Sequence, residues 1–181
     1  MIGSGLTFAD VAISLHRQGH QGKIQAISRH GLMPLAHTAR PVPPLPLSPS
    51  LQTVWDRGDL RGTLRELRVM ARQADDWRRV IDALRPSIAT FWRKLDHTQR
   101  SRFLRHARAY WEIHRHRVAA PLMSELEMLR QTGQLSLHAS RLQHADLAGD
   151  RVRASVRDRT TGELRTVEAD VLIRATGLET D

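Results

Sequence analysis

The sequence contains no cysteine, almost no lysine and no long run of uncharged apolar residues. The absence of cysteine excludes a disulfide framework, a thiolate zinc site, a cysteine nucleophile and a redox Cys-x-x-Cys pair. No apolar run approaches the roughly 18 residues of a membrane-spanning helix, and no charged flank followed by an apolar stretch marks the N-terminus as a leader. We therefore expect a soluble, cytoplasmic protein that does not act at a membrane.

The charge of the chain is one-sided and is carried almost entirely by arginine. The formal net charge is +9, from 28 basic and 19 acidic residues, and Lys23 and Lys94 are the only lysines. Guanidinium groups bind phosphates and carboxylates in a fork and stack on aromatic rings. This charge favours a polyanion or a phosphorylated cofactor as a partner without choosing between them. The alternative is that the high arginine content reflects codon usage alone and indicates no binding partner.

Four segments of the chain differ in pattern. Residues 1–40 carry glycines around an amphipathic helical pattern and a short apolar strand that ends at Ser28. The prolines of residues 41–56 predict an extended connector, because proline disrupts both helix interiors and central strands. Apolar residues at three- and four-residue spacing predict helices over residues 57–133. Alternation between turn signals predicts a β-meander and a return strand over residues 134–181.

The helical segment divides into four expected helices, which start near Leu60, Trp77, Thr98 and Pro121. Pro86 interrupts the second of these helices, and the third continues to His114 without a break. In the last segment, the nearly all-apolar run Val171–Ile173 predicts a strand that is buried on both faces.

The sharpest local pattern is Gly3-Ser4-Gly5-Leu6-Thr7-Phe8 at the start of the chain. Two glycines at this spacing let the backbone turn tightly out of a strand. They also let N–H groups approach a pyrophosphate at a helix N-terminus, where the dipole favours negative charge. Phe8 takes the position of the third glycine in the usual pattern. The alternative is a tight turn that starts an ordinary helix, with Ser4 or Thr7 as its N-cap.

The strand that follows this helix ends at Ser28-Arg29-His30. At this point a Rossmann unit contacts the adenosine ribose, through an acidic residue for a 2′-hydroxyl or a basic residue for a 2′-phosphate. A hydroxyl and a guanidinium suit a phosphate, so Ser28, Arg29 and His30 favour NADP(H) over NAD(H). For Arg29 alone, the alternative is a solvated surface arginine.

Together and in this order, the motifs resemble the second nucleotide-binding unit of bacterial FAD/NAD(P)-binding flavoproteins, which are distantly similar to flavin-containing and N-hydroxylating monooxygenases. The resemblance is carried by Gly3–Asp10, Ile27–Gly31, Trp77–Arg117, and Val171–Gly177 with Asp181. It implies an α/β fold, in which a partial Rossmann-like unit is combined with a large helical insertion and a β-meander. Residues 1–40 would then form the NADP-binding segment.

The resemblance also implies which residues bind the cofactor. Gly3, Ser4, Gly5, Leu6 and Thr7 would hold the pyrophosphate of NADPH, and Ala175, Thr176 and Gly177 would border the cofactor cleft near the flavin. We assign no catalytic residue, because hydride chemistry belongs to the cofactors. We also assign no metal ligand, because the histidines lack a partner pattern.

The start of the chain departs from the family pattern. No strand–GxGxxG–helix segment for FAD is found, and the strand before Gly3 is reduced to Met1-Ile2. We therefore expect an internal piece of a longer flavoprotein, with NADPH reducing an FAD held mainly by segments absent here. The complete oxidoreductase would act on an unidentified small molecule, and this chain alone would be inactive.

A basic, helical nucleic-acid-binding module without enzymatic activity is the rival function. Six arginines between Arg100 and Arg117 are interleaved with Phe103, Tyr110 and Trp111, and such a pattern can bind nucleic acid. The alternative is an amphipathic helix that buries its aromatic rings and extends its arginines into solvent. We favour this alternative because the aromatic residues follow the apolar stripe.

Overall fold

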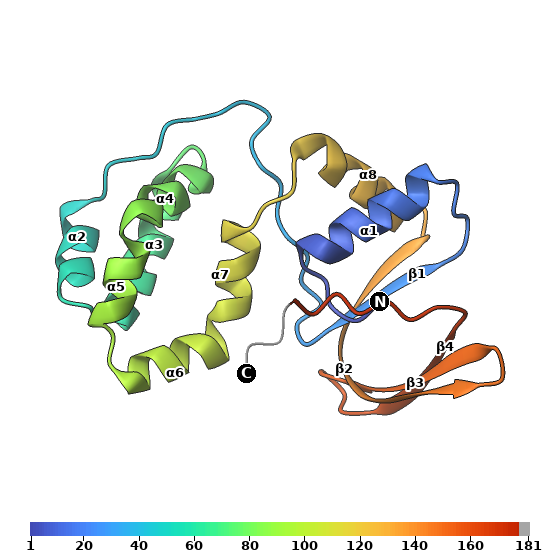
Figure 1. The fold of residues 1–181 in the computed structure, drawn as a ribbon. Coiled ribbons are helices and arrows are strands. Elements are labelled where there is room, and N and C mark those ends of the chain that lie inside the picture. Colours follow the sequence, from blue (N-terminus) through green and yellow to red (C-terminus); the bar gives the residue numbers. More distant parts are fainter. Residues whose placement is uncertain (178–181) are drawn as a thin grey trace. The chain divides into compact units, whose positions relative to one another are not determined.

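The computed structural model describes residues 1–177 and shows a mixed α/β architecture (Figure 1). The chain divides into two compact units, which we call unit 1 (Met1–Ala36 with His116–Asp181) and unit 2 (His37–Arg115). Each unit has its own hydrophobic core. The predicted fold class is confirmed: a partial Rossmann-like unit is combined with a large helical insertion and a β-meander. In the described part of the chain, no helix is long and apolar enough to span a bilayer.

Unit 1 is built on a short parallel sheet. Helix α1 (Leu6–Arg17) leads to strand β1 (Ile24–Ser28), as the sequence pattern predicts. β1 pairs in parallel with the beginning of β2 (Leu135–Ala148). On its other side, β1 is bridged in parallel by Ile2, and Ile2 is bridged in turn by Arg174. The chain from Ile2 through α1 to β1 is therefore a βαβ unit with a very short first strand.

Met1–Gly3 occupies the place of a central strand between β1 and the last described residues. The Ile2 amide donates to the Ile173 carbonyl at 2.9 Å, and the Ala175 amide donates to the Ile2 carbonyl at 2.7 Å. The predicted strand at Val171–Ile173 is wrong, since Val171 is 69% exposed and pairing is limited to the bridge. Because Arg174 bridges Ile2, the pairing lies one residue beyond the apolar run and does not extend along it.

The β-meander consists of β2, β3 (Arg151–Asp158) and β4 (Leu164–Ala169), paired in antiparallel fashion. β2 belongs to both sheets, because its first residues pair with β1 and its residues from Ser140 onward pair with β3. β4 was not predicted. Its sequence lacks a clear alternation of buried apolar residues, and Leu164 is 57% exposed.

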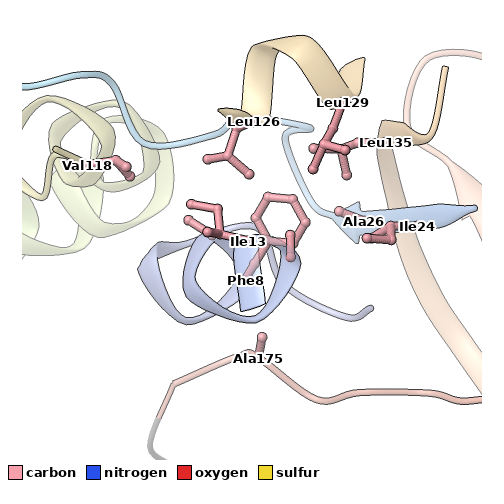
Figure 2. Packing of buried hydrophobic residues seen from close by; sticks show 11 residues of the cluster. Phe8, Ile13, Ile24, Ala26, Val118, Leu126, Leu129, Leu135 and Ala175 are labelled. Carbon is pink, nitrogen blue, oxygen red and sulfur yellow. The ribbon is translucent and has the colours of Figure 1, made fainter. Parts of the chain in front are cut away.

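The core of unit 1 lies between α1, α8 (Ala120–Gln131) and the parallel sheet. Figure 2 shows Phe8 and Ile13 of α1 facing Leu126 and Leu129 of α8. Phe8, at the position of the third fingerprint glycine, is completely buried. α8 lies in the span predicted for the helical insertion, but its buried leucines belong to this core.

Unit 2 is entirely helical in its regular structure. Its helices are α2 (Pro49–Asp56), α3 (Leu60–Gln73), α4 (Trp77–Leu84), the 3₁₀ turn Arg85–Ser87, α5 (Ile88–Lys94), α6 (His97–His106) and α7 (Arg108–Arg115). The core of this unit is centred on Trp55, which stacks on Phe91 with ring centroids 4.0 Å apart. Pro86 interrupts the chain between α4 and α5, as predicted.

Two expectations for unit 2 are wrong. The second half of the predicted connector forms α2, because Ser48 caps the helix by accepting the Leu51 amide and Pro49 occupies its first turn, where proline is well tolerated. The single helix predicted from Thr98 to His114 is divided at Ala107, where φ is −115°. On a straight helix, Phe103 and Trp111 would point about 80° apart, whereas both pack against the core of unit 2.

Candidate nucleotide-binding site

The first glycine of the turn is required by the close approach of another chain segment. Gly3 has a φ of +105°, and a Cβ atom at this position would lie 2.2 Å from the carbonyl oxygen of Ala175. Gly5 has a negative φ, and its Cβ would contact no atom within 4 Å. Thus Gly3 joins the turn to residues 173–175, whereas Gly5 faces open space that a ligand can occupy.

The N-terminus of α1 has the features of an anion site. Gly5 is the N-cap, and no side chain accepts a hydrogen bond there, so the alternative in which Ser4 or Thr7 caps the helix does not hold. Gly5, Leu6 and Thr7 are exposed, and no acidic residue lies in the first turn. The first amides of a helix lack intrahelical acceptors and carry the positive end of its dipole. These amides can therefore donate to a phosphate.

The hydroxyl groups of Ser4 and Ser28 join the glycine turn to the loop that follows β1. Their oxygen atoms lie 2.8 Å apart, and Ser4 also donates to the carbonyl of Leu32. Ser28 Oγ accepts the Gly31 amide at 3.1 Å. Ser4 is buried, so the two serines hold the turn in place through contacts within the protein. No local sequence pattern indicates this pairing.

Replacing Ser4 with alanine is expected to reduce the free energy of unfolding by about 1–3 kcal/mol, because the bonding partners of a buried hydroxyl lose their hydrogen bonds. Urea unfolding followed by circular dichroism measures this change. Ser14 of α1 is exposed, and Ser14→Ala is the control, expected to be neutral or slightly stabilising because alanine favours helix. Equal effects of the two substitutions would contradict the assigned role of Ser4.

A cluster of positive groups lies beyond the end of β1. Arg29 is exposed, and its carbonyl accepts a hydrogen bond from Arg159 Nη1 at 2.9 Å. The pKa of His30 is lowered, first by partial burial and then by the charges of Arg159 and Arg29. Burial and the two positive charges therefore favour the neutral form of the His30 imidazole. Sequence reasoning missed Arg159, because it follows β3, far along the chain from Arg29.

The predicted cofactor-binding residues fall into three groups: the glycine turn, the end of β1, and Ala175 with the two residues after it. The third of these groups lies next to the glycine turn. Ala175 is buried against Gly3, whereas Thr176 and Gly177 are exposed. Thr176 Oγ1 accepts a hydrogen bond from Arg174 Nε at 3.1 Å. Asp181, which was grouped with this motif, lies outside the described residues.

The structure brings the three predicted groups to one edge of the parallel sheet. Gly3 contacts Ala175, and Ser4 bonds Ser28, so the turn lies beside both of the other groups. Each group lies at the carboxyl end of a parallel segment: the glycine turn at Met1–Gly3, the basic group at β1, and the third group at residues 173–175. In open α/β sheets, ligands bind outside the carboxyl ends of the strands.

The arginine-rich helices α6 and α7 expose Arg102, Arg105 and Arg108, but two of the three aromatic rings named for the rival function pack inward. Phe103 lies edge-on to Trp92 at 5.6 Å between ring centroids, and Trp111 packs against the core of unit 2. Arg100 donates to the Trp92 carbonyl, and the Arg117 side chain is buried. Phe103 and Trp111 therefore follow the amphipathic alternative and pack inward, whereas Tyr110 is 51% exposed.

The fold matches part of FAD/NAD(P)-binding monooxygenases. One match is the ornithine N-hydroxylase of Kutzneria sp. 744, in a structure described as FADred-NADP+-L-orn. It is 16% identical to this chain, and the TM-score is 0.51. The match covers 97% of this chain and 34% of that protein. The ornithine hydroxylase PvdA of Pseudomonas aeruginosa is 19% identical with a TM-score of 0.50, covering 99% of this chain and 36% of that protein. The chain thus spans about a third of their length, and at this identity the similarity concerns the fold alone. No protein-family model and no curated protein matches the sequence.

Proposed function

We propose that this chain is the NADPH-binding part of an FAD-dependent oxidoreductase. The observation that carries the proposal is the gathering of a glycine turn, a basic strand end and residues 175–177 at the carboxyl edge of one parallel sheet. The similarity to part of two ornithine hydroxylases, one of them solved with FADred and NADP+, agrees with this proposal.

In this proposal the backbone holds the pyrophosphate. The exposed amides of Gly5, Leu6 and Thr7 donate to its oxygen atoms, because the first turn of α1 leaves them without intrahelical acceptors. The open space beside Gly5 admits the phosphate, which a side chain at this position would obstruct. Gly3 and Ser4 shape the turn through their contacts with Ala175 and Ser28.

The end of β1 supplies the preference for NADP(H). Arg29 donates to the 2′-phosphate of the adenosine ribose, with His30 beside it and Ser28 holding the loop. Ala175, Thr176 and Gly177 would border the cofactor cleft near the flavin. The chemistry that the bound cofactors would supply is hydride transfer from NADPH to FAD, and these residues would contribute binding and orientation. Segments other than those described would hold most of the FAD, so we expect this chain alone to be inactive as an enzyme.

Titration of the chain with NADPH and NADH tests the proposal. We expect NADPH to bind at least about tenfold more tightly, because charge-assisted hydrogen bonds to the 2′-phosphate each contribute on the order of one decade. Arg29→Glu should remove this preference by repelling the phosphate. Arg72→Glu in α3 applies the same charge change at an exposed position of unit 2 and should leave the preference intact. Equally weak binding of both nucleotides to the unmodified chain would overturn the proposal.

A further inference from the structure

Arg159 is anchored at the carboxyl edge of the parallel sheet by two hydrogen bonds. Its backbone amide donates to the carbonyl of Ala139 at 2.9 Å, and its Nη1 donates to the carbonyl of Arg29 at 2.9 Å. Ala139 is the register partner of Ser28, the last residue of β1. The turn after β3 therefore brings an exposed guanidinium next to the loop predicted to hold the 2′-phosphate.

No acidic side chain of residues 1–177 forms an ion pair with either of the two arginines at this point, Arg29 and Arg159. The neighbouring carboxylate of Asp158 accepts the amides of Thr160 and Thr161, so it serves the turn itself. Arg159 Nη1 bonds the Arg29 carbonyl, and both arginines lower the pKa of His30, so the two charges act on the same imidazole. Like charges held together in this way favour the binding of an anion.

We propose that Arg159 is a second phosphate ligand, which with Arg29 clamps the 2′-phosphate of NADPH and determines specificity for it. This inference rests on the proposed function and adds a residue that the glycine and strand-end motifs do not include. One donor of the Arg159 guanidinium is used by the Arg29 carbonyl, and a guanidinium has five. The remaining donors can form a charge-assisted pair with a phosphate dianion. The bond to Arg29 also orients the guanidinium before the ligand arrives, which reduces the entropic cost of binding.

Two small nucleotides isolate this contact from the rest of NADPH. Adenosine 2′,5′-bisphosphate carries the proposed recognition group, whereas 5′-AMP lacks it. We expect Arg159→Gln to weaken binding of the bisphosphate about tenfold or more and to leave 5′-AMP within twofold. Arg159→Lys, which keeps the charge but loses the fork, should give a smaller loss. Arg151→Gln, at the opposite end of β3, is the control for net charge and should change neither probe.

The outcomes separate this inference from the proposed function. If the unmodified chain binds both probes equally and does not prefer NADPH to NADH, the proposed function fails. If Arg29→Gln removes the preference and Arg159→Gln does not, only the role of Arg159 is overturned. Equal weakening of both probes by Arg159→Gln would show that Arg159 merely positions the loop, which also overturns it. If Arg159→Gln does not fold, Arg159→Lys decides, and wild-type affinity of that variant for the bisphosphate counts against the inference.

Discussion

Replacing Gly3 with alanine is expected to reduce the free energy of unfolding by about 2–5 kcal/mol, from a left-handed backbone penalty and from overpacking. The φ of +105° disfavours any side chain, and the new Cβ would lie 2.2 Å from the Ala175 carbonyl oxygen. Relief of this clash must separate the turn from residues 173–175. Urea unfolding with amide hydrogen exchange in β1 measures the loss.

Gly19→Ala is the matched control for this substitution. Gly19 also has a positive φ, of +85°, but its Cβ would have no neighbour within 4 Å. It therefore isolates the left-handed backbone cost, which is roughly 1–2 kcal/mol. The difference between the two variants reports the contact between Gly3 and Ala175. If both variants lose the same stability, the close approach of the two segments is refuted.

Replacing Phe8 with alanine is expected to cost about 3–5 kcal/mol, as is typical when a buried aromatic ring is removed from a core. Phe8 of α1 is fully buried and faces the leucines of α8 (Figure 2). The sequence has four tryptophans, and Trp55, Trp77, Trp92 and Trp111 all lie in unit 2. Hydrogen exchange in α1 should therefore be used to detect the loss, with tryptophan fluorescence as a separate report on unit 2.

Phe8→Gly separates the two interpretations of this position. The substitution restores the third glycine of the dinucleotide fingerprint, but it also adds roughly 1 kcal/mol of helix penalty to the lost ring. We expect it to be less stable than Phe8→Ala and to bind NADPH no better. Phe8→Leu keeps most of the apolar volume and should cost about 1.5 kcal/mol or less. A folded Phe8→Gly variant with improved nucleotide affinity would contradict the role of Phe8 as a core residue.

Local signals in the sequence are sufficient for the elements that surround the glycine turn. The apolar spacing of Phe8, Ala12 and Leu15 predicts α1, and the buried run from Ile24 predicts β1, both of which the structure confirms. The long helix α3 and the interruption at Pro86 follow in the same way. These elements are predictable because side-chain periodicity and proline act within a few residues of themselves.

Long-range packing changed several other elements. α6 and α7 carry a continuous helical pattern, yet the chain bends at Ala107, where Phe103 and Trp111 both pack against one core. β4 is paired with β3 although its own residues carry little strand pattern. Val171 is apolar but exposed, since the bridge that pairs its chain segment lies beyond it, at Arg174. In each case the outcome depends on partners that a local window does not contain.

The sequence by itself determined the α/β class, the glycine turn before α1 and the basic end of β1, because each depends on residue types that are close together in the chain. Only the tertiary structure decided which of these residues meet. Ser4 and Ser28 are 24 residues apart, and Arg159 and Arg29 are 130 apart, yet both pairs are joined by hydrogen bonds. Such contacts arise where parallel strands and the meander end at one edge, so their partners are chosen by sheet topology rather than by spacing along the chain.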